Sequence, residues 1–195
     1  MKGILLKDLL CIRKNIWVCV FIIAVFGLFS DNGVVFALFY SIMLPVNAIA
    51  LDERSRFERL LPALPVNSLT YVLSKYLIAY GFIALTAVLS IALSTVKMHA
   101  FAVPEELPAS MALCLLATAI TLVLIFRFGV EKGRMIYMVS VVVQAGLLGA
   151  LGAIMEEQTL IPLPVIGWIA FALAAAVNVG SVFAARTVYE NRLLA

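Results

Sequence analysis

Long apolar runs separated by short polar segments constrain this chain more than any other feature. Of its 195 residues, 65% are hydrophobic, and the mean hydropathy is +1.13, whereas soluble domains are roughly 45–50% apolar. A helix needs about 20 apolar residues to cross the hydrocarbon layer of a membrane. Six such segments and their loops use the whole length, so the sequence predicts one all-α transmembrane domain over residues 1–195.

The expected spans are residues 16–29, 34–51, 71–95, 109–126, 135–155 and 161–185, followed by a polar tail. Pro45 removes a backbone hydrogen bond inside the second span and predicts a kink. Residues 1–15 predict an amphipathic interfacial helix, or else an ordinary basic flank of the first span. Its two sides would be the polar Gly3, Lys7, Cys11 and Lys14 and the apolar Ile4, Leu5, Leu9 and Ile12.

The distribution of basic residues predicts the orientation of these spans. Four basic residues precede the first span, four lie between or near the second and third, three lie between the fourth and fifth, and two follow the sixth. Of the 14 basic residues, only Lys97 falls on the opposite side. Because cytoplasmic loops are enriched in Lys and Arg, both termini are predicted to be cytoplasmic.

Few polar residues interrupt the spans. Asn47, Gln144 and Asn178 are neutral and can hydrogen-bond across helices. Lys75 lies about five residues into the third span, where its side chain is expected to snorkel to the cytoplasmic interface. No acidic residue lies in a span interior, which argues against an ion-driven transporter.

Small residues recur at every fourth position of the last two spans. Such rows let helices approach closely, and the two interpretations are packing within one bundle or an interface between subunits. The residues are Ala145, Gly149 and Ala153 in the fifth span, and Ala172, Ala176, Gly180 and Ala184 in the sixth.

No catalytic or metal-binding pattern is found in the sequence. His99 is the single histidine and lies in a short loop expected to face outward, and the pairs Glu105-Glu106 and Glu156-Glu157 fall in outer loops. The three cysteines have no metal or redox spacing. There is no phosphate-binding loop of the ATPase type. No enzymatic activity, cofactor or metal is therefore expected in this chain.

One cytoplasmic segment, residues 52–65, concentrates charge. Six of its first eight residues are charged, against 13% for the whole chain. Asp52 and Glu53 suit the first turn of a helix, and Pro62 would end that helix after about two turns. Because arginine and aromatic residues are enriched at protein interfaces, the segment predicts a docking surface. The alternative is a solvated connector.

The same segment resembles part of a known family. Asp52 and Glu53 after the second span, Phe57, then Leu64-Pro65-Val66 and Ser74-Lys75-Tyr76 are similar to the permease subunit of ABC type-2 exporters. The layout also agrees, with about 200 residues, an interfacial helix and six spans. Many members carry tryptophan where Phe57 stands here.

The resemblance implies a homodimer or a heterodimer with a paralogue, multi-pass in a bacterial plasma membrane, with ATP and Mg held by a separate cytosolic ATPase. Residues 52–68 would be the coupling loop, and the substrate an amphipathic or hydrophobic molecule such as a peptide. The residues implied to contact the ATPase are Asp52, Glu53, Arg54, Arg56, Phe57, Glu58, Arg59, Leu60 and Leu61.

A second hypothesis comes from another class, the substrate-binding membrane module of a vitamin uptake transporter. Such modules also have about six spans and about 190 residues. They would be expected to show a polar, aromatic-lined pocket toward the outside, whereas the outer loops here offer little beyond the two glutamate pairs.

Overall fold

The structure, a computed structural model, describes residues 2–29, 33–55, 57, 67–98, 107–157 and 163–194, and these contain no strand. They form six helices: α1 (Lys2–Phe29), α2 (Gly33–Arg54), α3 (Ser68–Met98), α4 (Leu107–Phe128), α5 (Val130–Glu157) and α6 (Leu163–Leu194). The predicted all-α class is confirmed, and each expected span falls on one helix.

Two helices extend well beyond their predicted spans. The interfacial segment and the first span form one continuous helix, α1, because no glycine or proline interrupts residues 4–26. The expected polar tail continues α6 as far as Leu194. α2 also runs on through Pro45.

Three of the helices are long and apolar enough to cross a membrane by length and composition. Among the described residues these are Ser68–Val96, Leu107–Phe128 and Val165–Asn191. The six-span topology stays a prediction.

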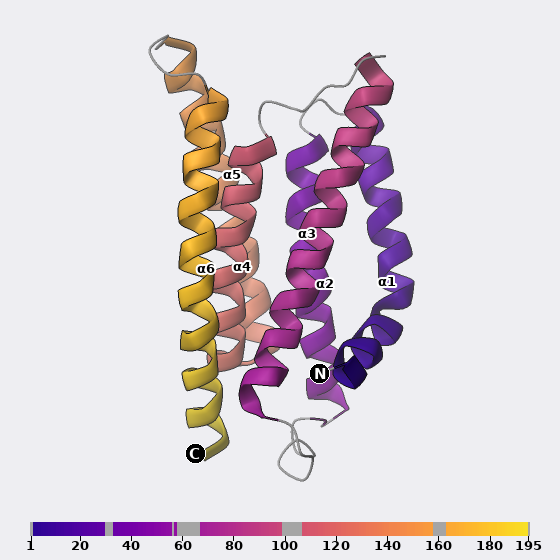
Figure 1. Cartoon of the computed structure of the whole chain (residues 1–195), viewed down its shortest axis with the longest axis vertical. Coiled ribbons are helices and arrows are strands. Elements are labelled where there is room, and N and C mark those ends of the chain that lie inside the picture. Colours follow the sequence, from indigo (N-terminus) through magenta and orange to yellow (C-terminus); the bar gives the residue numbers. More distant parts are fainter. Residues whose placement is uncertain are drawn as a thin grey trace.

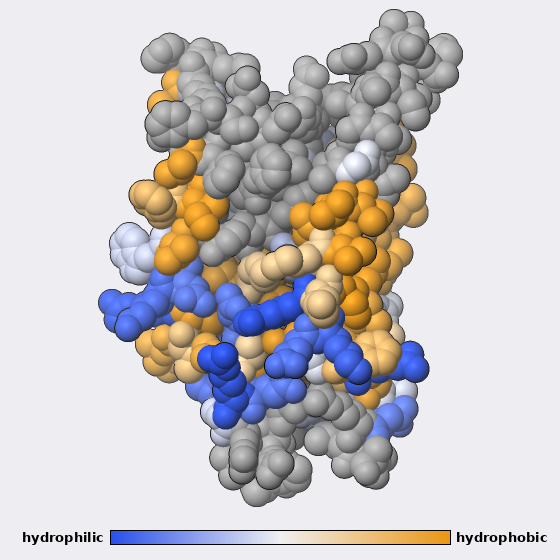
Figure 2. Space-filling view, turned by 180° about the vertical axis from the view of Figure 1, so that it is seen from behind, coloured by the Kyte–Doolittle hydropathy of each residue, from blue (hydrophilic) through white to orange (hydrophobic). Residues whose placement is uncertain are grey.

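The helices lie side by side in two groups (Figure 1). α1, α2 and α3 pack against one another, and α4 packs mainly against α5 and α6. Contacts of α2 with α4 and α5, and of α3 with α4 and α6, join the groups. The two marked termini lie toward the same end of the bundle, at the bottom of Figure 1. We call this the basic end, because a hydrophilic band crosses the lower part of the molecule (Figure 2). Its basic side chains include Lys7, Arg13, Lys14, Arg54, Lys75, Arg127, Lys132, Arg134 and Arg186.

α6 packs on α4 through a row that the sequence analysis did not single out. Ala174, Asn178 and Ala185 are buried, and a Cβ at Gly167 would meet the Ala109 nitrogen at 3.0 Å. The small residues predicted to pack, Ala172, Ala176, Gly180 and Ala184, are all exposed instead. They therefore do not hold this chain's own bundle together. The side chains at 145, 149 and 153 on α5 lie outside the described set.

Two of the three polar residues predicted to bridge helices do so. Asn178 donates to the Leu115 carbonyl at 2.8 Å and accepts from the Tyr80 hydroxyl at 3.2 Å, which joins α6 to α4 and α3. Asn47 accepts from Arg134 at 3.0 Å, which joins α2 to α5. The side chain of Gln144 is not described.

Gly133 allows α5 to lie close to α4, and this contact gives a stability prediction. A Cβ at Gly133 would meet the buried Ile125 Cγ1 at 2.1 Å, whereas a Cβ at Gly81 of α3 would meet nothing within 4 Å. We expect Gly133→Ala to lower the free energy of unfolding by about 1–3 kcal/mol. Gly81→Ala should leave it unchanged or raise it by up to about 1 kcal/mol. Unfolding in detergent followed by circular dichroism measures both, and equal effects would contradict the close approach.

Candidate functional site

The charged segment begins inside α2 rather than as a separate helix. Asp52, Glu53 and Arg54 form the last turn of α2, and the Ser55 backbone N–H donates to the Leu51 carbonyl at 2.9 Å. The Ser55 hydroxyl donates to the Asp52 carbonyl at 3.1 Å, which closes this end of the helix. The separate helix predicted to start at Asp52 is therefore wrong at its beginning. Arg56 and residues 58–61 of the same prediction lie outside the described residues.

Asp52 points into the bundle and is only 4% exposed. One carboxylate oxygen accepts from Lys7 Nζ at 2.5 Å. The other accepts from Lys75 Nζ at 2.6 Å and from the Tyr71 hydroxyl at 3.1 Å. Asp52 thus joins the end of α2 to the starts of α1 and α3.

Asp8 of α1 completes a closed ring of ion pairs. Its carboxylate lies 2.6 Å from Lys75 Nζ and 3.2 Å from Lys7 Nζ, and Asp8 is 1% exposed. We call Lys7, Asp8, Asp52 and Lys75 the ion cluster. Its two positive and two negative charges balance, which is the condition under which charges can be buried.

The expected snorkelling of Lys75 is wrong. Its side chain is fully buried, and its ammonium contacts both aspartates and lies 5.0 Å from the centre of the Tyr71 ring. Since two carboxylates replace water around the ammonium, Lys75 does not need to reach the interface.

Lys7 lies at the partly exposed edge of the ion cluster. Burial lowers its pKa, but the hydrogen bond and negative charge of Asp52 and the charge of Asp8 outweigh burial, so the pKa is raised overall. Lys7 Nζ also lies 3.7 Å from the centre of the Phe57 ring. The aromatic residue of the predicted docking segment is therefore held against α1 by a cation–π contact.

Glu53 connects the end of α2 to the second helix group. Its carboxylate accepts from the Val130 backbone N–H at 3.3 Å, at the N-terminus of α5 where a negative charge is favoured. Gly129, between α4 and α5, has φ +86°, a conformation that glycine adopts without strain. Its N–H donates to the Ile125 carbonyl at 2.8 Å and closes the end of α4.

The comparison with protein-family models is consistent with this layout and decides the family. Residues 3–190 match the model described as ABC-2 family transporter protein. The chain belongs to the ABC-2 transporter family. No curated protein and no solved structure matched in the other two comparisons.

Family membership makes this chain the membrane component of an ABC transporter, a type of protein generally without a catalytic site of its own. The family also implies association with a cytosolic ATPase and with the membrane. The permease role favours the resemblance to ABC type-2 permeases over the hypothesis of a vitamin-binding module. Among the described residues, no group of three His, Cys, Asp or Glu side chains could hold a metal ion.

The first turns of α1 in this ABC-2 permease largely follow the two predicted sides, with Gly3, Cys11 and Lys14 exposed, but Leu9 of the predicted apolar side is 42% exposed. Ile4, Asp8 and Ile12 are buried, whereas Leu6 and Leu10 are 60% and 61% exposed. The row facing the bundle is thus apolar at both ends and acidic in the middle, because Asp8 is paired with Lys75. Sequence analysis missed Asp8; its signal was a lone carboxylate between two isoleucines at helical spacing.

The charge balance of the ion cluster gives a second prediction. Lys75→Met leaves the buried Asp8 without its 2.6 Å partner. We therefore expect it to lower the free energy of unfolding by about 3–5 kcal/mol. The double variant Lys75→Met/Asp8→Asn keeps the Lys7–Asp52 pair and should recover most of that loss, because the charges balance again. Chemical denaturation in detergent measures both. A single variant as stable as wild type would show that the ion pairs contribute nothing.

Proposed function

We propose that this ABC-2 chain is the permease of an exporter that moves an amphipathic or hydrophobic substrate, such as a peptide, across a bacterial plasma membrane. ATP and Mg are held by a separate ATPase at the basic end, which faces the cytosol. The observation that carries the proposal is the anchoring of the charged segment. Asp52 and Phe57 at its start, and Tyr71 and Lys75 just beyond its end, all meet around the ion cluster.

This anchoring suits a segment that receives force from an ATPase. Displacement of a loosely attached connector would not move the helices beside it. Here both ends of the segment are attached to the helices by the buried Asp52–Lys75 ion pair, so displacement of the ends moves those helices. Those helices are α1, α2 and α3, each of which supplies a member of the ion cluster. The segment therefore serves as the coupling loop of the permease.

The residues from Asp52 to Leu61 form the proposed contact with the ATPase. Asp52 supports that contact from inside the bundle, while Glu53 and Arg54 are exposed at its edge. The contact continues through Arg56, Phe57, Glu58, Arg59, Leu60 and Leu61.

The interior above the basic end supports an apolar or amphipathic substrate. The buried polar side chains described there are hydroxyls and one amide, including Thr86, Ser90, Thr118 and Asn178, and none of them carries a charge. A small ionic substrate would find no fixed partner among these residues.

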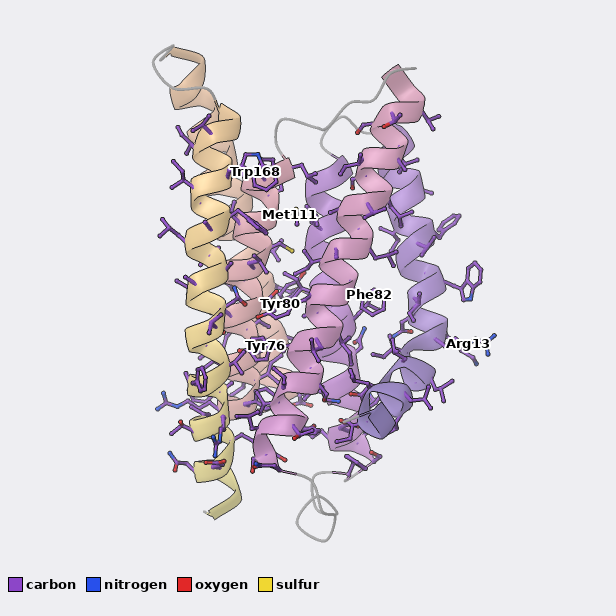
Figure 3. All side chains as sticks on the ribbon, in the orientation of Figure 1. Arg13, Tyr76, Tyr80, Phe82, Met111 and Trp168 are labelled. Atoms are coloured by element: carbon purple, nitrogen blue, oxygen red, sulfur yellow. The ribbon has the colours of Figure 1, made fainter. Side chains whose placement is uncertain are left out.

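Docking is tested by removing charge from the loop. We expect the double variant Arg56→Gln/Arg59→Gln to bind the ATPase about tenfold more weakly, because a few polar interface contacts contribute on this scale. The matched control is Arg13→Gln/Lys14→Gln, which removes the same charge from exposed positions on α1, where the Arg13 side chain points away from the bundle (Figure 3).

Co-purification of the permease with a co-expressed cytosolic ABC ATPase subunit measures the pairing. Normal binding by the loop variant would contradict the docking assignment. Failure of the wild-type protein to retain any ATPase would contradict the proposed function as a whole.

A dimer is the second part of the proposal, formed through the exposed row Ala172, Ala176, Gly180 and Ala184 on α6 together with Ala145, Gly149 and Ala153 on α5. Exposure of the α6 row supports it, because a small-residue row that packs within no bundle is free to meet a second copy or a paralogue.

The dimer predicts a sensitive position at Gly180. A Cβ there would meet nothing within 4 Å, so Gly180→Leu should leave the fold of one chain unchanged. We expect it to shift the purified permease from dimer to monomer in light-scattering measurements. Val179→Leu, a neighbouring position that is 62% exposed, is the control. A dimer that tolerates Gly180→Leu would place the interface elsewhere.

A further inference from the structure

We propose that Tyr71 is the positioning residue that carries displacement of the coupling loop from the first helix group to the second. The proposal rests on the proposed function, because it assumes that an ATPase displaces this loop. It assigns a specific task to a residue that neither the sequence patterns nor the family match singled out.

The hydroxyl of Tyr71 belongs to the anchoring of the loop. Tyr71 lies in the first turn of α3, four residues after Asn67, and is fully buried. Its hydroxyl donates to Asp52 at 3.1 Å, on the carboxylate oxygen that also accepts from Lys75. A displacement of Asp52, at the other end of the loop, therefore acts on the Tyr71 side chain through this hydrogen bond.

The ring of Tyr71 belongs to the contact between the two helix groups. Its centre lies 6.3 Å from that of Phe126 on α4 and 5.3 Å from that of Tyr189 on α6. Phe126 and Tyr189 also meet edge to face at 5.6 Å, so the three rings form a closed triad from three helices. All three residues are at most 1% exposed. Close-packed buried rings transmit displacement because no space is available for them to yield.

Other links between the groups are weaker or unconnected to the loop. The Glu53 carboxylate reaches Val130 at 3.3 Å, but Glu53 is exposed and the contact can exchange with water. The hydroxyls of Tyr76 and Tyr80 bond to Ser181 and Asn178 on α6, and Figure 3 shows both rings lying between α3 and α6. Within the described part of the chain, neither of these tyrosines hydrogen-bonds to the ion cluster. Tyr71 therefore combines the loop anchor and the inter-group contact in one buried side chain.

The test compares two hydroxyl deletions on the same helix. Tyr71→Phe removes the bond to Asp52 and keeps the ring, whereas Tyr76→Phe removes a bond of the same length, 3.1 Å, between α3 and α6. Both tyrosines are fully buried, but the bond to the Asp52 carboxylate is charge-assisted, so Tyr71→Phe should lose somewhat more thermal stability than Tyr76→Phe. The permease–ATPase complex is reconstituted in lipid nanodiscs, and the stimulation of ATP hydrolysis by the permease is measured against the ATPase alone.

We expect Tyr71→Phe to retain the ATPase at the wild-type level but to reduce the stimulation roughly fivefold, the scale of one hydrogen bond. Tyr76→Phe should keep the wild-type stimulation. A second variant, Phe126→Leu, interrupts the triad from the α4 side and should reduce the stimulation as well. Combined with Tyr71→Phe it should add little, because both changes break the same link.

Wild-type stimulation in Tyr71→Phe, or equal losses in Tyr71→Phe and Tyr76→Phe, would overturn the assignment of Tyr71 while leaving the proposed function standing. Additive losses in the double variant would overturn it too, since the two residues would then act separately. If the wild-type permease captures no ATPase, the proposed function and this inference fail together.

Discussion

The rest of this permease depends on one constraint: the ammonium of Lys75 is buried away from water and needs carboxylate partners. Lys75 is fully buried, and α3 itself contains no acidic residue, so the compensating carboxylates must come from other helices. Asp8 of α1 and Asp52 of α2 supply them, and Lys7 balances the second negative charge. The meeting of three helices at the basic end is therefore fixed by charge balance, whereas apolar packing alone would allow helices to slide or rotate.

The same balance decides which residues remain for a partner. Asp52 is turned inward, and Glu53 accepts a hydrogen bond from the Val130 backbone N–H at the start of α5. Both carboxylates therefore already have partners within this chain. Glu53 and Arg54 are both exposed at the end of α2, and the sequence that follows adds Arg56 and Arg59 against Glu58, so the segment after Asp52 carries a net positive charge. An ATPase groove that receives this loop would complement it best with acidic side chains.

The sequence predicted the helices well, because long apolar runs are local signals. It did not predict how the helices face one another. The pairing of Asp8 with Lys75 joins residues that are 67 positions apart, and no periodicity encodes it. For the same reason the small-residue row of α6 was recognised but its direction was not, since that depends on Gly167 and Asn178 contacting α4. The triad around Tyr71 likewise draws on three distant helices.

The position of Asp8 in the chain also has a consequence for biosynthesis. The ribosome completes Asp52 well after Lys7 and Asp8, and Lys75 later still. Until α2 is made, Lys7 and Asp8 therefore have only each other as partners within the ion cluster, and Asp8 lacks Lys75 until α3 follows. During that interval the exposed Leu6 and Leu10 can hold the segment at the membrane surface while the two charged side chains remain hydrated. The start of α1 thus completes its native ion pairs only when both α2 and α3 are present.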